Sequence, residues 1–150
     1  ALQNRCVADE CRLRINLFRH QIHWIGPQQA AADVSRLRRL VHHLGDPTHS
    51  MKFQLGLVEL AAKLGLLPRA RRHLETARTL LATVDDKAVQ AEFALSAVAL
   101  TALESNLSDA LALALQLVPL AEEVGSASAQ LGFQQILHTC WWRSRVSKKH

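Results

Sequence analysis

Histidine is the residue of this sequence that is best suited to bind a metal ion, and eight histidines occur in 150 residues. His20 and His23 are three residues apart, which places both on one face of a helix, close enough to share an ion. A zinc site needs a third and usually a fourth ligand, and the sequence has no CxxC or HExxH pattern to supply them. His42 and His43 are adjacent and point in different directions on a helix, and His49 begins the next segment. We therefore expect these histidines on the surface or in a groove, with no bound metal and no cofactor.

The sequence contains no pattern that is typical of an active site. It has neither a Gly-rich phosphate loop nor a nucleophile elbow. Its paired carboxylates, Asp85-Asp86 and Glu122-Glu123, lie near the expected ends of helices, where acidic residues cap the helix or are solvated. We predict that this chain is not an enzyme, although a domain attached to it in a longer protein could be catalytic.

Cysteine usage and hydropathy indicate a protein of the cytoplasm. The three cysteines are an odd number without a CxxC pair, which favours reduced thiols: Cys6, Cys11 and Cys140. No basic-then-apolar signal segment opens the chain. The longest weakly polar run, Ala94–Leu103, is too short to cross a bilayer. Because the chain does not begin with Met, we expect it to be a piece of a longer cytoplasmic protein that does not contact a membrane.

The formal net charge of +5 raises the possibility of nucleic-acid binding. No recognised nucleic-acid-binding motif accompanies the charge, so we interpret the basic residues as solvated helix faces and a basic tail. A nucleic-acid-binding helical domain is the alternative. The basic residues cluster at Arg36, Arg38, Arg39, Arg69, Arg71, Arg72, Arg78, Arg143, Arg145, Lys148 and Lys149.

Apolar periodicity predicts an all-helical chain. Ala and Leu dominate over Val, Ile and Thr, which favours helices over strands. Stripes of apolar residues at spacings of three and four predict seven helices, separated by glycines, prolines and aspartates. We expect a kink or a break at Pro119, inside the sixth helix. The seven segments are Leu2–Trp24, Pro27–Leu44, a helix from Pro47 to about Leu64, a helix within Gly65–Val84, Lys87–Glu104, a helix ending near Val124, and Ala127–Arg145.

Small residues recur at fixed offsets with a period of 39 to 40 residues. Gly65, Gly26 and Ser105 occupy equivalent turns, and each is followed at offsets of five, nine and twelve by a similar set. Such a period indicates a helical-repeat array in which small side chains let two helices approach closely. We expect the closest crossings at Ala31, Ala70 and Ala110. The three sets are Ala31, Ser35, Arg38, then Ala70, Leu74, Ala77, then Ala110, Ala114, Leu117.

These residues resemble the tetratricopeptide-repeat (TPR) superfamily. The middle unit matches the repeat best, with Val58, Gly65, Ala70, Leu74 and Ala77 at the family's positions, although its period exceeds the family's usual 34 residues. The resemblance implies an all-α, right-handed α-solenoid of about seven antiparallel helices, that is, three helical hairpins and a C-terminal helix. A globular helical bundle is the alternative. We place one repeat domain at 1–145, with units 1–45, 46–85, 86–125 and a half unit 126–145, followed by a frayed basic tail at 146–150.

The resemblance also implies a function. The phrases LGDP and LAEEVGSA are similar to the long-period repeats of multidomain bacterial regulators such as transcriptional activators, adenylate or diguanylate cyclases, and kinases. There the array is a non-catalytic sensory module that binds a protein or peptide and controls an output domain. The family's groove positions carry over to the first helix of each pair, and about half of them could simply pack. They are Leu13, Asn16, His20, His23, Trp24, Lys52, Leu55, Glu59, Ala62, Lys63, Glu92, Leu95, Ala99, Ala102 and Leu103.

Trp141 and Trp142 suggest a second contact surface. Adjacent residues on a helix point about a hundred degrees apart, so at most one of the two indoles can face the core. The repeat period predicts a further helix beyond Arg145. An array that ends before this helix exposes the apolar face that the helix would have covered. We therefore predict self-association through the C-terminal helix near Trp141 or Trp142, unless that helix is a terminal cap.

Overall fold

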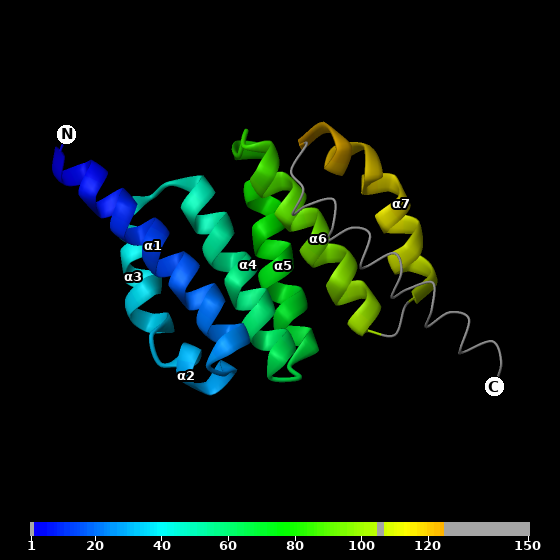
Figure 1. Ribbon diagram of the computed structural model, residues 1–150, viewed down its shortest axis with the longest axis horizontal. Helices are drawn as coiled ribbons and strands as arrows, with labels where there is room; N and C mark the ends of the chain where they lie inside the picture. The colour runs from blue at the N-terminus through cyan, green and yellow to red at the C-terminus, as the bar shows by residue number, and fades with distance from the viewer. Residues whose placement is uncertain (1, 105–106, 125–150) are drawn as a thin grey trace. The chain divides into compact units, whose positions relative to one another are not determined.

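The computed structural model of the chain describes residues 2–104 and 107–124 (Figure 1). These residues form seven α-helices and one 3₁₀ turn, and no strand occurs among them. The chain divides into two compact units, Ala1–Val84 and Asp85–His150, and each is described by itself. The all-helical fold class is therefore confirmed, and the division lies where two of the expected repeat units meet.

The N-terminal unit contains α1 (Leu2–Trp24), α2 (Pro27–Ala31), α3 (Val34–Leu44), α4 (Pro47–Lys63), α5 (Leu67–Leu80) and the 3₁₀ turn η1 (Leu81–Thr83). In Figure 1, α1 and α4 lie side by side and run in the same direction, whereas α4 and α5 form an antiparallel hairpin. Asp46 begins α4 by accepting a hydrogen bond from the Thr48 backbone N–H at 3.2 Å. Gly45 and Gly65, both at positive φ, end the preceding helices.

The core of this unit lies around α1. Four of its side chains at helical spacing are buried, and they meet residues of α2, α3 and α4. The rings of Phe18 on α1 and Phe53 on α4 are 6.2 Å apart at their centroids. The cluster consists of Cys11, Ile15, Phe18, Ile22, Ala30, Leu37, Val41, Phe53, Leu57 and Leu60.

Gly56 lets α1 and α4 approach closely. A Cβ atom added at this glycine would lie 2.8 Å from Cε1 of Phe18 and 3.2 Å from Cγ of Arg19, well inside van der Waals contact. Phe18 is 2% exposed, and its ring packs against that of Phe53 on the same helix as Gly56. The absence of a side chain at residue 56 therefore sets the distance between these two helices.

Two of the three alanines expected at close crossings are fully buried. Ala70 on α5 and Ala110 on α7 have no exposed surface, which confirms their inward position. The expectation for Ala31 is wrong, because Ala31 is exposed and its neighbour Ala30 is buried instead. Ala30 has the helical spacing of four and seven residues to Val34 and Leu37, which agrees with its buried position, whereas the repeat offset had indicated Ala31.

The predicted helix Pro27–Leu44 is divided in the structure. The backbone N–H groups of Ala32 and Asp33 donate to the carbonyl groups three residues earlier, and this tightened turn separates α2 from α3. Asp33 is a weak helix former that favours helix starts, which gives the local reason for the interruption. The remaining boundaries of this unit agree with the predicted segments within a few residues, and α1 coincides with Leu2–Trp24.

The second unit contains α6 (Lys87–Leu103) and α7 (Leu107–Val124), which pack against each other. Asp86 caps α6, since its carboxylate accepts from the Ala88 backbone N–H at 2.9 Å. Val98 of α6 and the alanines Ala110 and Ala114 of α7 form a buried cluster. Helix α7 continues through Pro119, so the chain does not break there. The predicted seventh helix, Ala127–Arg145, lies outside the described residues.

Candidate partner-binding surface

Helix α1 carries two opposed apolar stripes. Cys11, Ile15, Phe18 and Ile22 form the buried one. The second stripe, Leu13, Leu17, His20 and Trp24, has the same four-three-four spacing but is displaced by two residues, which is about 200° around the helix. Leu13 is 59%, Leu17 54% and Trp24 76% exposed. We call this second set the outer stripe of α1, and it presents large apolar side chains to solvent.

The C-terminal end of the outer stripe is an aromatic platform. The rings of His20 and Trp24 stack with their centroids 5.6 Å apart and their planes inclined by 27°. An exposed indole combines a large apolar surface with few rotatable bonds, which is why tryptophan is common in binding hot spots. Ile25, 58% exposed, follows directly.

An ionic cluster fixes this end of α1 to α4. Nη2 of Arg19 donates to Oε1 of Glu59 at 2.6 Å, and Nε of Arg19 donates to the same oxygen at 3.2 Å. His23 places its Nε2 3.2 Å from the other oxygen, Oε2. Both side chains of the Arg19–Glu59 pair are only about one-fifth exposed, so this pair is less weakened by solvent than a fully exposed one.

The structure brings together some of the sequence-predicted groove residues. His23 and Glu59 contact each other, and Asn16, His20 and Trp24 lie exposed on α1. On α4, Lys63 is exposed and Lys52 is half-buried. Glu92 is half-buried on α6, in the second unit.

The predicted set of groove residues wrongly includes Leu55 and omits Arg19. The placement of Leu55 in the groove is wrong, because this side chain is fully buried in the core. Arg19 was not among the predicted groove residues, although it lies forty residues before its partner Glu59, which is one sequence period. That separation is the signal that could have identified the pair.

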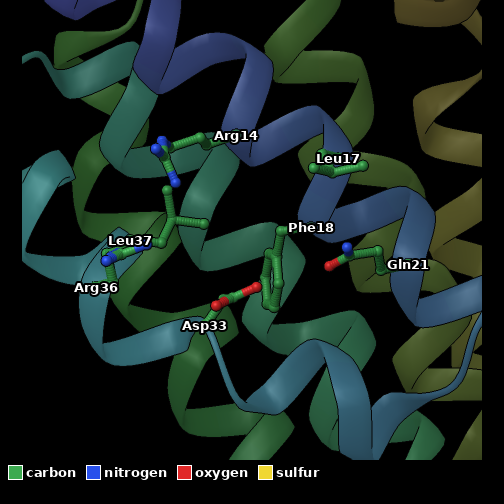
Figure 2. Close-up of a pocket in the computed structure, with 7 residues that line it drawn as sticks. All are labelled: Arg14, Leu17, Phe18, Gln21, Asp33, Arg36 and Leu37. Carbon is green, nitrogen blue, oxygen red and sulfur yellow. The ribbon is translucent and has the colours of Figure 1, made fainter.

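A hollow lies beside the outer stripe, between α1 and α3 (Figure 2). The empty space within its rim is about 330 Å³, a value that includes open solvent and is therefore larger than the cavity itself. Figure 2 shows Arg14 and Arg36 on one side of the hollow and Leu17 and Gln21 on the other. The complete lining is Arg14, Leu17, Phe18, Gln21, Asp33, Arg36 and Leu37. An apolar floor with charged groups at its edge suits one apolar side chain flanked by polar ones.

Four histidines in the described part of the chain each contact a neighbouring side chain. His49 forms an ion pair with Asp46 at the start of α4, and Nδ1 of His73 donates to Oε1 of Gln54 at 3.2 Å. Nowhere in 2–104 or 107–124 do three or more His, Cys, Asp or Glu side chains converge as a metal site would require. The side chains of His20 and His23 instead contact Trp24 and Glu59.

His73 should make the stability of the N-terminal unit depend on pH. Burial lowers the pKa of His73 below its usual value, and the nearby Arg38, Arg69 and Arg72 lower it further. The unfolded chain then binds a proton more readily than the folded one, so stability falls as pH drops below about 6.5. We expect His73→Gln, which can still donate to Gln54, to lose less stability than the parent between pH 7.5 and pH 5. Urea unfolding followed by circular dichroism at both pH values measures this difference, and equal losses would contradict the prediction.

The two cysteines in the described part of the chain differ in their surroundings. Cys6 is exposed, whereas Cys11 is buried in the core, and burial together with the neighbouring acids Asp46 and Glu10 raises the pKa of the Cys11 thiol. A raised pKa disfavours the reactive thiolate. The guanidinium of Arg38 lies 6.0 Å from the centre of the Phe53 ring. Cys140, Trp141 and Trp142 lie outside the described residues.

Comparison with known proteins yields no match: no family model, no curated protein and no solved structure resembles this chain significantly. Among the helices of the described part, none combines the length and the apolar character that a membrane span requires.

Proposed function

We propose that this chain is a non-catalytic protein-interaction module that binds a helix or peptide of a partner protein along the outer stripe of α1. The observation that carries the proposal is the exposure of Leu13, Leu17 and Trp24 in one line on one helix. Scattered apolar residues on a surface need no explanation, but an aligned set of large ones marks an interaction site. Their four-three-four spacing suits an amphipathic helix laid alongside α1.

The supports of α1 fit this role. The buried stripe and the Arg19–Glu59 pair attach α1 to the unit, so binding does not have to order the helix. A preorganised surface loses less conformational entropy on association than a flexible one does. The Trp24–His20 stack supplies a rigid aromatic anchor at one end of the stripe.

We further propose that the module is a TPR-like repeat array from a cytoplasmic bacterial signalling protein, in which partner binding controls an output domain. Two observations support the array. Arg19 and Glu59, which are one sequence period apart, meet across the parallel helices α1 and α4. The small residues Ala70 and Ala110, also one period apart, are both fully buried. The bacterial signalling context rests on the resemblance of the sequence phrases alone.

Selection from a phage-displayed library of amphipathic helical peptides tests the binding surface. Enriched peptides should bind the parent, and the double variant Leu17→Glu/Trp24→Glu should bind them at least about tenfold more weakly, because it places charge on the apolar stripe. Leu66→Glu is the matched control, since Leu66 is 41% exposed but precedes α5 and should leave binding unchanged.

The proposal fails if no enriched peptide depends on Leu17 and Trp24. Tight binding to generic duplex DNA that declines steeply with salt would instead favour a nucleic-acid-binding function through the arginines of α3 and α5.

A further inference from the structure

Charge is distributed very unevenly along the chain. Residues 1–84 contain thirteen Lys and Arg against six Asp and Glu, a formal charge of +7, whereas residues 85–124 contain one against seven, a formal charge of −6. Residues 125–150 contain four Lys and Arg and no Asp or Glu. Helix α3 contains three arginines and no acidic residue, and α7 contains three acidic residues and no Lys or Arg. Two helices of this kind attract each other when they belong to different molecules.

The hollow between α1 and α3 is lined by apolar side chains and has two arginines on one side. Leu17 and Leu37 line it, and Arg14 and Arg36 lie together on one side (Figure 2). Arg14 uses its Nε in the bond to Glu10, at 2.9 Å, which leaves its two terminal nitrogens available. Within the described part of the chain, no ion pair or hydrogen bond occupies the guanidinium of Arg36.

The outward face of α7 has the complementary pattern. Leu115, 59% exposed, is the large apolar side chain on a stripe of exposed residues with helical spacing: Ser108, Ala112, Leu115, Pro119 and Glu122. Glu122 lies two turns beyond Leu115 on the same face, about 10 Å along the axis, and Asp109 lies at the other end of the helix. An extended arginine side chain covers part of this distance, and the glutamate side chain covers the rest.

We propose that α7 of one copy of this chain docks on the α1–α3 hollow of a second copy. Leu115 enters the hollow beside Leu17, and the carboxylate of Glu122, on the same face of α7, lies toward Arg14 and Arg36. Asp33 also lines the hollow, and its negative charge disfavours an orientation of α7 that would place Glu122 beside it.

This contact is heterologous, because each copy offers a different surface to the next. Copies therefore join head to tail, as open chains or as a closed ring. The inference rests on the proposed function because it uses the same surface of α1. A bound copy of the chain would compete with an external partner for Leu17, so self-association would regulate partner binding.

Light scattering and sedimentation of the whole chain test this arrangement. The mass should grow with concentration beyond that of a dimer and fall as salt screens the charges. Arg36→Glu should raise the concentration needed for association about tenfold. Leu115→Ser should do the same, whereas Arg78→Glu, which makes the same charge change on α5, and Leu66→Ser should leave association unchanged.

A charge exchange gives the decisive measurement. The Arg36→Glu chain and a Glu122→Lys chain should each associate weakly alone, and their mixture should regain association because every junction is again complementary. A parent that stays monomeric at all concentrations, association that ignores Arg36→Glu, or a mixture without recovery would each overturn the inference. A monomeric parent that still binds the selected peptides through Leu17 would overturn only the inference and leave the proposed function standing.

Discussion

Replacing Phe53 with Ala is expected to destabilise the N-terminal unit by about 3–5 kcal/mol. Phe53 is 2% exposed and packs on α1 through the ring of Phe18 and on α3 through Arg38. Its removal therefore leaves a cavity where three helices meet, and it also ends an aromatic contact worth about 0.5–1.5 kcal/mol. Because small domains are stable by only about 5–15 kcal/mol, the variant should be close to unfolding at 37 °C.

Urea unfolding followed by circular dichroism measures this loss. Leu13→Ala is the matched control, since Leu13 is 59% exposed on the same helix pair and its truncation should stay within about 0.5 kcal/mol. A Phe53→Ala variant that unfolds at nearly the same urea concentration as the parent would show that α1, α3 and α4 do not share this core.

Leu74→Ala should cost about 2–5 kcal/mol, with a value in the upper half of that range. Leu74 is fully buried on α5, between Ala70 and Ala77 on the same inward stripe. Alanine side chains are too short to move into the space that the leucine leaves, so the cavity stays open and its cost is close to the maximum.

The same unfolding experiment applies, with Leu66→Ala as the control for losing a leucine that is 41% exposed. If Leu74→Ala cost less than about 1 kcal/mol, the α4–α5 hairpin would not be packed through this stripe.

The helices of this chain could be predicted because local chemistry defines their ends. Gly26 and Pro27 fix the end of α1, and Asp46 and Asp86 cap α4 and α6 as their position before each helix indicates. These signals act within one turn of the chain, so they are readable without any tertiary contact.

The details of the N-terminal core could not be predicted in the same way. The repeat offset indicated Ala31, whereas the helical spacing to Val34 and Leu37 indicates Ala30, which is the residue that is buried. The interruption between α2 and α3 depends on a tightened turn at Asp33. Gly56 showed no local signal for the close approach of Phe18, because the contact joins helices almost forty residues apart.

The candidate surface was predictable only in part. The groove positions that the resemblance implies include Leu13 but not Leu17. Whether a neighbouring helix covers an apolar side chain depends on tertiary packing, and in the structure both side chains are exposed. The pairing of Arg19 with Glu59 likewise depends on how two helices cross, which composition does not define.

A substitution at Gly56 on α4 is expected to affect the proposed binding surface on α1. In a typical exposed helix interior, Gly→Ala improves stability by about 1 kcal/mol, so a redesign guided by helix propensity alone would choose it. Here the new methyl group would collide with the side chains of Phe18 and Arg19, so these side chains or α1 itself would have to move, beside the Arg19–Glu59 pair. A buried residue thus influences the surface that we propose for partner binding, and variation at position 56 should alter the affinity of that surface.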